Sequence, residues 1–310
     1  MEPDPPDATA VSRRRFLTWA AATALLAGCE RLPAPDEVRV GLALGGGGAR
    51  GLAHLVAMET LDELGIRPHR IAGTSIGAVL GALYAAGHSG RAIREFANGL
   101  IIAEGDTWKE ILFEKQTFKW LGFFDVDVIG GGLFDSEGFM EYLGGLLDVE
   151  RFEQLKIPLQ VVAADLWTGD QVVFDSGPLL PAIKASMAIP GIFEPVPHQG
   201  RHLVDGGIVN PLPHDLLVRD CDLVIAVDVT GDRAAAEGSP GYTEALFTSF
   251  HNMQKRILLQ RLERQPPEIY LKPRIEGVRV LEFYEADAIY AQAAGMKKEL
   301  KRALRHRLDL

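Results

Sequence analysis

Short apolar runs alternate with longer segments of helical spacing from residue 38 onward. The apolar runs predict strands at residues 38–44, 69–72, 157–166, 170–174, 201–204, 223–229 and 268–271. Helical spacing predicts helices at residues 52–64, 78–84, 136–147, 179–188, 242–263 and 285–307. A chain in which strands and helices alternate in this way is typical of an α/β fold.

One predicted strand–helix junction carries a serine between two glycines. The run 69–72 leads into Gly73-Thr74-Ser75-Ile76-Gly77, and small apolar residues follow it. G-x-S-x-G between a strand and a helix is the pattern of a nucleophile elbow, a sharp turn that exposes the serine hydroxyl. Glycine neighbours avoid steric clashes on such a turn, and the following helix directs its positive dipole end at the serine. Because five residues can match by chance, Ser75 becomes a strong candidate nucleophile only together with other motifs.

A glycine-rich loop follows the first predicted strand. Gly45-Gly46-Gly47-Gly48-Ala49-Arg50-Gly51 joins it to the helix 52–64, where exposed backbone N–H groups can surround an anion. A dinucleotide site is not favoured, because the second strand ends in Gly73-Thr74-Ser75 and not in an acidic residue. A P-loop would need G-K-[ST], which is absent. The loop therefore suits either a phosphate or the oxyanion of acyl transfer.

Two polar residues near this loop have more than one interpretation. Arg50 either caps carbonyls at the surface or orders the loop. His54 is expected to be a packed helix residue and not a base.

An aspartate ends another predicted strand. Residues 201–204 run into Asp205-Gly206-Gly207. A residue at a strand end is expected to be exposed toward the sheet edge that holds Ser75. Taken alone, Asp-Gly is more typical of an ordinary turn.

Composition limits the classes of function. The 310 residues are 47% hydrophobic and 24% charged, as in a folded globular protein. The formal net charge of −10 argues against nucleic acid as a partner. The sequence shows no spacing typical of a calcium or zinc site, so neither a metal nor another cofactor is expected.

Residues 1–28 predict an export signal. Ser12-Arg13-Arg14-Arg15-Phe16-Leu17 matches a twin-arginine motif. The apolar stretch 18–27 behind it would span only about 15 Å of helix, too little to cross a bilayer. Leu26-Ala27-Gly28-Cys29 resembles a bacterial lipobox, which implies cleavage before Cys29 and its diacylation. On this interpretation, residues 29–37 tether a single domain at 38–310 to a membrane of the bacterial cell envelope.

The segment 91–149 is the least regular part of the predicted domain. Large apolar side chains crowd residues 108–124. They either pack in the core or form a partly exposed cap that accepts acyl chains or touches a membrane. We favour the cap, because Gly130-Gly131-Gly132 provides a hinge-like break behind it.

The motifs, in this order, resemble the patatin-like phospholipase family. The matching pieces are Gly46-Gly47-Gly48-Ala49-Arg50-Gly51, Gly73-Thr74-Ser75-Ile76-Gly77 and Asp205-Gly206-Gly207. Residues 186–193 and 158–169 also look like its bacterial branch, which is related to the patatin domains of neuropathy target esterase. The resemblance covers roughly residues 38–230, with the helices of 240–310 beyond it.

The resemblance implies a three-layer α/β fold with a mostly parallel central sheet and helices on both faces. It also implies a serine acyl-ester hydrolase of the phospholipase A or lysophospholipase type, acting on lipid or other acyl esters. Ser75 would be the nucleophile and Asp205 the base of a Ser–Asp dyad without histidine. The backbone of Gly46 to Ala49 would form the oxyanion hole, and Arg50 would order that loop.

Two alternatives remain open. An α/β-hydrolase with a triad in the order Ser, Asp, His would draw its base from His214, His251 or His306. A non-catalytic, lipid-binding envelope lipoprotein would carry the same motifs as a vestigial site.

Overall fold

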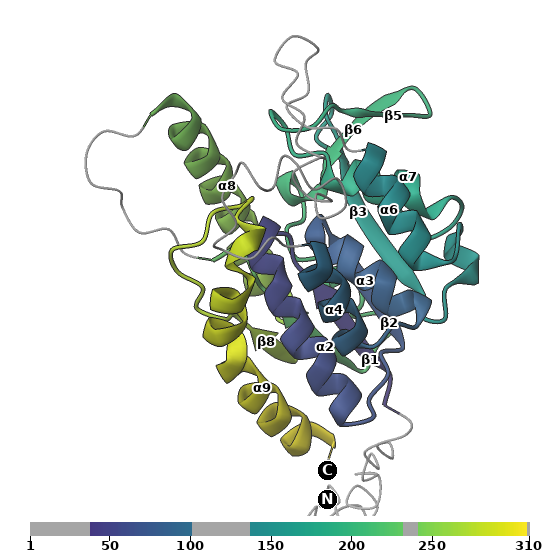
Figure 1. Ribbon diagram of the computed structural model, residues 1–310, viewed down its shortest axis with the longest axis vertical. Coiled ribbons are helices and arrows are strands. Elements are labelled where there is room, and N and C mark those ends of the chain that lie inside the picture. The colour runs from purple at the N-terminus through teal and green to yellow at the C-terminus, as the bar shows by residue number, and fades with distance from the viewer. Residues whose placement is uncertain (1–37, 101–136, 232–240, 309–310) are drawn as a thin grey trace, which may run out of the picture. The chain divides into compact units, whose positions relative to one another are not determined.

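A computed structural model describes residues 38–100, 137–231 and 241–308 of the chain (Figure 1). They belong to a unit that spans Val38–Leu310. The twin-arginine motif, Cys29, the tether and the apolar stretch 108–124 lie outside the described residues, so the expectations for them stand as predictions.

Within the described residues, eight strands form one mixed sheet in the order β5-β6-β3-β2-β1-β7-β8, with β4 also paired to β3. The run β3-β2-β1-β7-β8 is parallel, and the pairs β3–β4, β3–β6 and β5–β6 are antiparallel. The expected mostly parallel sheet is confirmed. The strands are β1 Val40–Leu44, β2 Arg70–Thr74, β3 Leu159–Asp165, β4 Gln171–Phe174, β5 Val196–His198, β6 Arg201–Asp205, β7 Leu223–Val227 and β8 Ile269–Leu271.

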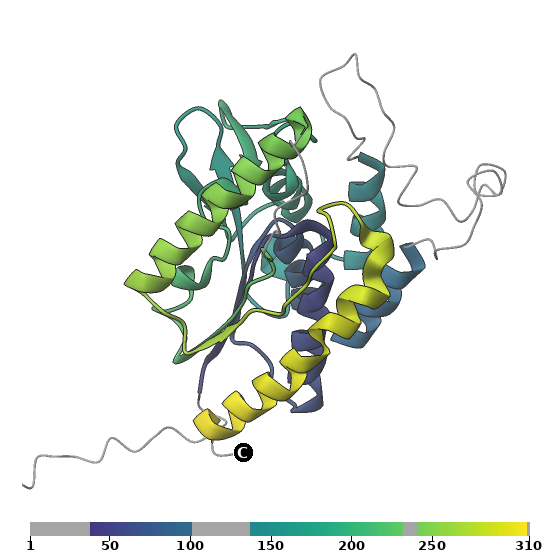
Figure 2. The same cartoon turned by 90° about the vertical axis from the view of Figure 1, so that its left-hand side faces the viewer.

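The helices cover both faces of this sheet, α8 lying on one side and α2 and α9 on the other (Figure 2). They are α2 His54–Glu63, α3 Ile76–Ala86, α4 Gly90–Leu100, α6 Glu137–Leu147, α7 Leu179–Met187, α8 Tyr242–Arg264 and α9 Ala286–Leu308. Helix α4 was not predicted. Its start carries a usable signal, because the Ser89 hydroxyl accepts a hydrogen bond from the Ala92 amide at 3.1 Å, as an N-cap does.

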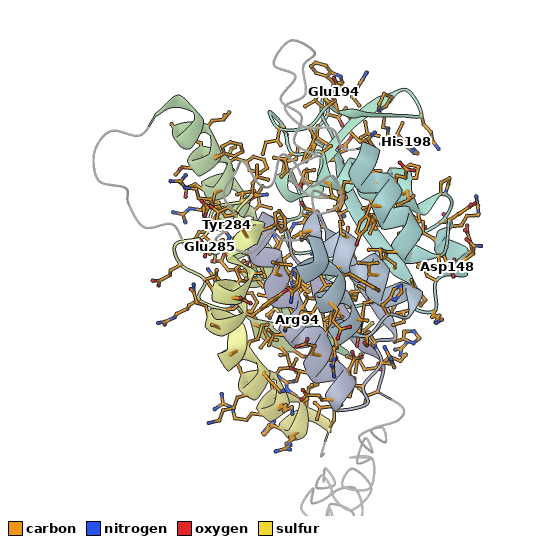
Figure 3. The ribbon with its side chains drawn as sticks, in the orientation of Figure 1. Arg94, Asp148, Glu194, His198, Tyr284 and Glu285 are labelled. Atoms are coloured by element: carbon orange, nitrogen blue, oxygen red, sulfur yellow. The ribbon has the colours of Figure 1, made fainter. Side chains whose placement is uncertain are left out.

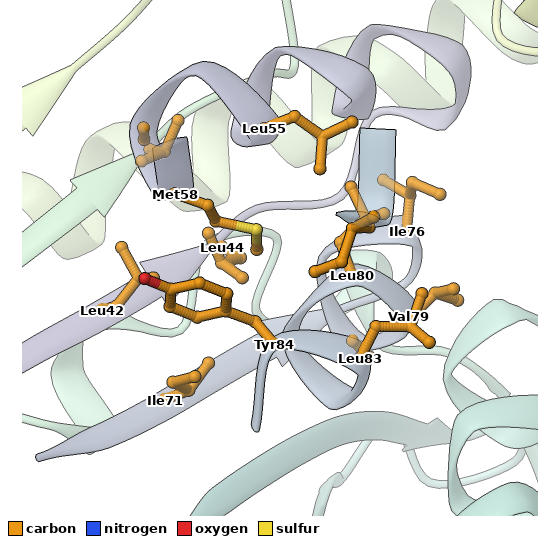
Figure 4. Close-up of a cluster of buried hydrophobic side chains, with 14 of the residues drawn as sticks. Leu42, Leu44, Leu55, Met58, Ile71, Ile76, Val79, Leu80, Leu83 and Tyr84 are labelled. Atoms are coloured by element: carbon orange, nitrogen blue, oxygen red, sulfur yellow. The ribbon is translucent and has the colours of Figure 1, made fainter. Parts of the chain in front are cut away.

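The two faces of the sheet differ in side-chain size. Larger residues of β1, β2 and β7 pack under α2, α3 and α9 in the main core (Figure 4). On the other face, Ala43, Ala72 and Ala226 form a thinner cluster with Leu258 of α8. Cys221 is buried in this second cluster. Small residues on that face let α8 and the loop before β7 approach the sheet closely.

Arg94 ties α4 to two other helices (Figure 3). Its guanidinium donates to the Glu59 carboxylate of α2 at 2.6 and 2.7 Å and lies 3.7 Å from the centre of the Tyr290 ring of α9. Helix α9 also buries Ile289, Ala293 and Met296. The C-terminal helix is therefore an integral part of the domain. No helix in the described part of the chain is both long and apolar enough to span a bilayer.

Candidate active site

Ser75 occupies a strained turn between β2 and α3. Its backbone has φ 56° and ψ −125°, a conformation that L-residues rarely adopt. A Cβ at Gly77 would overlap the Leu44 carbonyl, and a Cβ at Gly73 would lie 2.7 Å from Ala78 Cα. The first turn of α3 thus packs directly against the strands, which only glycine permits. The turn is as sharp as the predicted nucleophile elbow requires, and the role of Ser75 as nucleophile stays a prediction.

Ser186 of α7 supports this turn, a contact that sequence reasoning missed. Its hydroxyl accepts a hydrogen bond from the Ser75 amide at 2.8 Å and donates one to the Val162 carbonyl at 2.6 Å. Ser186 is fully buried, so no water can replace either contact. It fixes the elbow to β3.

We expect Ser186→Ala to cost about 1–3 kcal/mol of folding free energy, because it leaves the Ser75 amide and the Val162 carbonyl unpaired. Chemical denaturation would measure this loss, and a steady-state assay should show a lower kcat. Ser89→Ala, which removes a helix cap far from the elbow, is the control: it should lose stability without losing kcat. Equal kcat in both variants would contradict a role for Ser186 in holding the elbow.

The register of β3 explains how Asp205 reaches Ser75. Thr74, at the end of β2, pairs with Val162, and Asp205, at the end of β6, pairs with the next residue, Ala163. Strand β2 is parallel to β3 and β6 is antiparallel to it, so the two carboxyl ends run toward each other. The Ser75 side chain lies close enough to the Asp205 carboxylate to lower the pKa of that group, and both residues line one pocket. The two side chains meet as predicted, although end to end and not along one edge of parallel strands.

Asp205 is buried, not exposed as the sequence led us to expect, with 3% of its surface accessible. Burial raises the pKa of its carboxyl to about 6, and hydrogen bonds from Ser75 and from the Gly207 amide partly oppose that rise. The Gly207 amide donates to Oδ1 at 2.7 Å. Such a carboxylate is more basic than a free one and is still largely ionised at neutral pH.

Two backbone amides of the glycine loop have no partner among the described residues, whereas two others are used by the fold. The Gly46 amide donates to the Pro211 carbonyl at 2.9 Å, and the Ala49 amide donates to the Val280 carbonyl at 2.7 Å. The amides of Gly47 and Gly48 have no hydrogen-bond partner among the described residues. Both glycines line the same pocket as Ser75.

Arg50 also lines this pocket and is only 4% exposed, so the surface interpretation of this residue was wrong. Its guanidinium lies against Gly231. Ala49 and Gly51 lie in the buried 3₁₀ helix Gly48–Ala53 and are not among the pocket-lining residues. A Cβ at Gly51 would overlap the Ile76 side chain, so Gly51 serves close packing against the elbow.

Polar and apolar residues together line the pocket. The volume that the centre of a water-sized sphere can occupy in the pocket is about 40 Å³, which is room for roughly three water molecules. The sequence reasoning missed the residues that α8 contributes, which share one face of that helix by their spacing. The lining residues are Gly46, Gly47, Gly48, Arg50, Ser75, Ile189, Asp205, Thr230, Phe247, Phe250, His251, Gln254 and Val280.

The candidate histidines lie in different surroundings. The two ring nitrogens of His214 lie 2.9 and 2.8 Å from the Leu212 and Gln265 carbonyl oxygens, and His306 is exposed on the last turn of α9. His251 is buried and lines the pocket. His54 packs in the core, as expected: its Nε2 lies 2.8 Å from the Gly45 carbonyl oxygen, and burial lowers its pKa to about 4. Of these residues, His251 alone borders the candidate site.

Among the described residues, no group of three or more His, Cys, Asp or Glu side chains is arranged to hold a metal ion.

Comparison with known proteins shows matches over most of the domain. The sequence profile of patatin-like phospholipases matches residues 42–218. An NTE family protein of Mycobacterium tuberculosis is 38% identical over 216 residues, a match that covers 69% of this chain and 56% of the relative. The lysophospholipase NTE1 of Kluyveromyces lactis is 30% identical over 280 residues, covering 81% of this chain and 18% of that protein. The chain thus spans 56% of the first relatives it matches.

Solved structures give weaker matches. VipD from Legionella pneumophila has a TM-score of 0.48 at 13% identity, covering 85% of this chain and 67% of its own. ExoU from Pseudomonas aeruginosa, in its complex with SpcU, has a TM-score of 0.46 at 15% identity, covering 89% of this chain and 54% of its own. The profile match extends over more than half of the residues, and with the 38% identical relative it shows that the chain belongs to the patatin-like phospholipase family.

Proposed function

We propose that this protein is a serine acyl-ester hydrolase that cleaves lipid esters with a Ser75–Asp205 dyad. The observation that carries the proposal is that the strained Ser75 and the buried Asp205 meet in one pocket, which two backbone amides without a described partner also line. One of the relatives is named a lysophospholipase, which supports a phospholipid or lysophospholipid substrate.

The proposed reaction begins with Ser75. Its hydroxyl proton passes to Asp205 as Oγ attacks the ester carbonyl carbon, and the alcohol leaves with a proton returned by Asp205. The carbonyl oxygen becomes an oxyanion held by the Gly47 and Gly48 amides, which narrows the expectation that all of Gly46 to Ala49 would form the hole. Such donors supply much of the rate enhancement, since losing one can cost about 2.7–4 kcal/mol.

Labelling with a fluorophosphonate probe tests the proposal directly, because an unactivated serine does not react. The wild-type protein should be labelled at Ser75 and should hydrolyse lysophospholipid. Ser75→Ala should lose labelling and lower turnover by at least about 1,000-fold while remaining folded. A folded wild-type protein that is neither labelled nor active would instead favour the vestigial binding protein.

The alternative of a Ser-Asp-His triad can be tested at His251, which borders the pocket. We expect His251→Asn to retain activity within about tenfold and to keep the pH profile of the wild type, since in the proposed dyad Asp205 itself accepts the Ser75 proton. His306→Asn, on the exposed last turn of α9, is the matched control. A loss of about 1,000-fold or more in His251→Asn alone would replace the dyad by a triad.

We further propose that Cys29 carries lipid and anchors the protein to a bacterial envelope membrane after twin-arginine export. The motifs at residues 12–17 and 26–29 support this location. Membrane fractionation of the full chain and of Cys29→Ser tests it. An unchanged distribution of the variant between membrane and soluble fractions would contradict the anchor.

A further inference from the structure

Gln254 of α8 lies over the part of the loop that carries Asp205. A Cβ placed on Gly207 would overlap the Gln254 amide nitrogen and would lie 3.0 Å from Asp205 Oδ1. The Gln254 amide nitrogen and Asp205 Oδ1 thus both lie close to the position that a Cβ of residue 207 would occupy. Gln254 lines the pocket together with Ser75.

The Gln254 amide is not used by the fold, although the helix that carries it is anchored. No described residue exchanges a hydrogen bond with it. Its helix is fixed one turn later by Leu258, which is 2% exposed in the second core cluster, and two turns later by the 2.7 Å ion pair between Arg261 and Asp215. A half-buried, positioned amide without a partner is suited to a ligand that enters the pocket.

The proposed dyad leaves one position beside Asp205 to be filled. After Ser75 is acylated, its oxygen no longer has a proton to donate to Asp205. A water molecule must then donate to that carboxylate and approach the acyl carbon, and the pocket has room for roughly three waters. Aligning this water requires another hydrogen-bonding group close to Asp205, and an amide can both donate and accept.

We infer that Gln254 positions the water that hydrolyses the acyl-enzyme, an inference that rests on the proposed Ser75–Asp205 chemistry. The water loses a proton to Asp205 as its oxygen bonds to the acyl carbon. The bond from that carbon to Ser75 Oγ then breaks, and Asp205 returns the proton to Oγ. The products are the free carboxylic acid and the regenerated serine. His251 also lines the pocket but already has an interaction partner, so Gln254 is the residue assigned.

Gln254→Ala tests the inference by separating acylation from deacylation. With a nitrophenyl ester, the burst of released nitrophenol should keep the wild-type rate constant, while the steady-state rate falls about 10- to 100-fold. Intact mass spectrometry should show acylated Ser75 as the dominant species during turnover. Asn252→Ala, at an exposed position of the same helix, is the control and should behave as wild type. A steady-state rate equal to that of the wild type, or an equal loss of burst and steady-state rates, would overturn the role.

Gln254→Glu gives a second measurement that a purely structural residue would not change. A carboxylate at this position keeps an oxygen for the water and adds a negative charge near Asp205. The midpoint of the pH–rate profile should therefore move upward, because a like charge raises the pKa of the base. An unshifted midpoint would refute the proximity of the two groups. If the wild-type protein is itself neither labelled nor active, the proposed function fails; if only the Gln254 variants behave as wild type, the present inference alone fails.

Discussion

Asp205→Asn is expected to abolish ester hydrolysis and, at the same time, to stabilise the folded protein at pH 8. The amide cannot accept the Ser75 proton, so turnover should fall by at least about 1,000-fold. Burial raises the pKa of Asp205 from 3.8 to about 6, so the ionised form at pH 8 costs folding free energy, up to about 3 kcal/mol. Asparagine removes the buried charge and can still accept the Gly207 hydrogen bond.

The sign of the pH effect follows from proton uptake. Because the folded state binds a proton more tightly at Asp205, this group contributes stability below about pH 3.8 that is lost as the pH rises through about 6. His54 acts in the opposite direction: its pKa is lowered from 6.5 to about 4, so its contribution is lost as the pH falls through that window. Only the difference between wild type and variant isolates Asp205.

Urea denaturation of wild type and Asp205→Asn at pH 8 and at pH 4 measures this difference. The stability gain should be present at pH 8 and largely gone at pH 4. The wild-type kcat/KM should also fall as the pH drops below about 6, where the base becomes protonated. An active Asp205→Asn protein would refute the dyad, and an equal gain at both pH values would refute the buried charge as its cause.

Gly46→Ala and Gly47→Val should separate catalysis from folding in the glycine loop. A Cβ on Gly46 would lie 3.3 Å from the Ser75 Cβ, a tight contact within the site that small shifts can relieve. We expect kcat/KM to fall about 100-fold in Gly46→Ala, with less than about 1 kcal/mol of lost stability. A Cβ on Gly47 would overlap the Val229 carbonyl, so Gly47→Val should lose stability as well as activity.

Steady-state kinetics and chemical denaturation on both variants test this contrast. Gly99→Ala, which introduces a Cβ into open space, controls for the added methyl group. Equal losses of stability in Gly46→Ala and Gly47→Val would show that both glycines serve only the fold.

Much of this arrangement could be predicted from local patterns. Gly73 and Gly77 around Ser75 specify a sharp turn by themselves, and the apolar runs specify the strands. The end-to-end approach of β2 and β6 that brings Asp205 to Ser75 could not be predicted, because it depends on the antiparallel pairing of β6 with β3, which no local signal encodes. The same limit applies to Ser186, 111 positions from Ser75, whose role depends on the packing of α7 against β3.

The pocket-lining face of α8 is the largest part of the candidate site that the sequence did not predict. Phe247, His251 and Gln254 recur at helical spacing in the sequence, which indicated a helix but not what it covers. Helical spacing shows which residues share one face of a helix, but not which other part of the protein that face contacts. The location of α8 over the pocket follows from Leu258 and Arg261, whose partners lie far away in the chain.

The profile shared with other patatin-like proteins ends at residue 218, yet α8 and Val280 line the pocket. The proposed reacting pair, Ser75 and Asp205, lies before that boundary, whereas part of the pocket lining lies beyond it. On the proposed function, substitutions on the pocket-lining face of α8 would change which esters fit while the reacting groups stay the same.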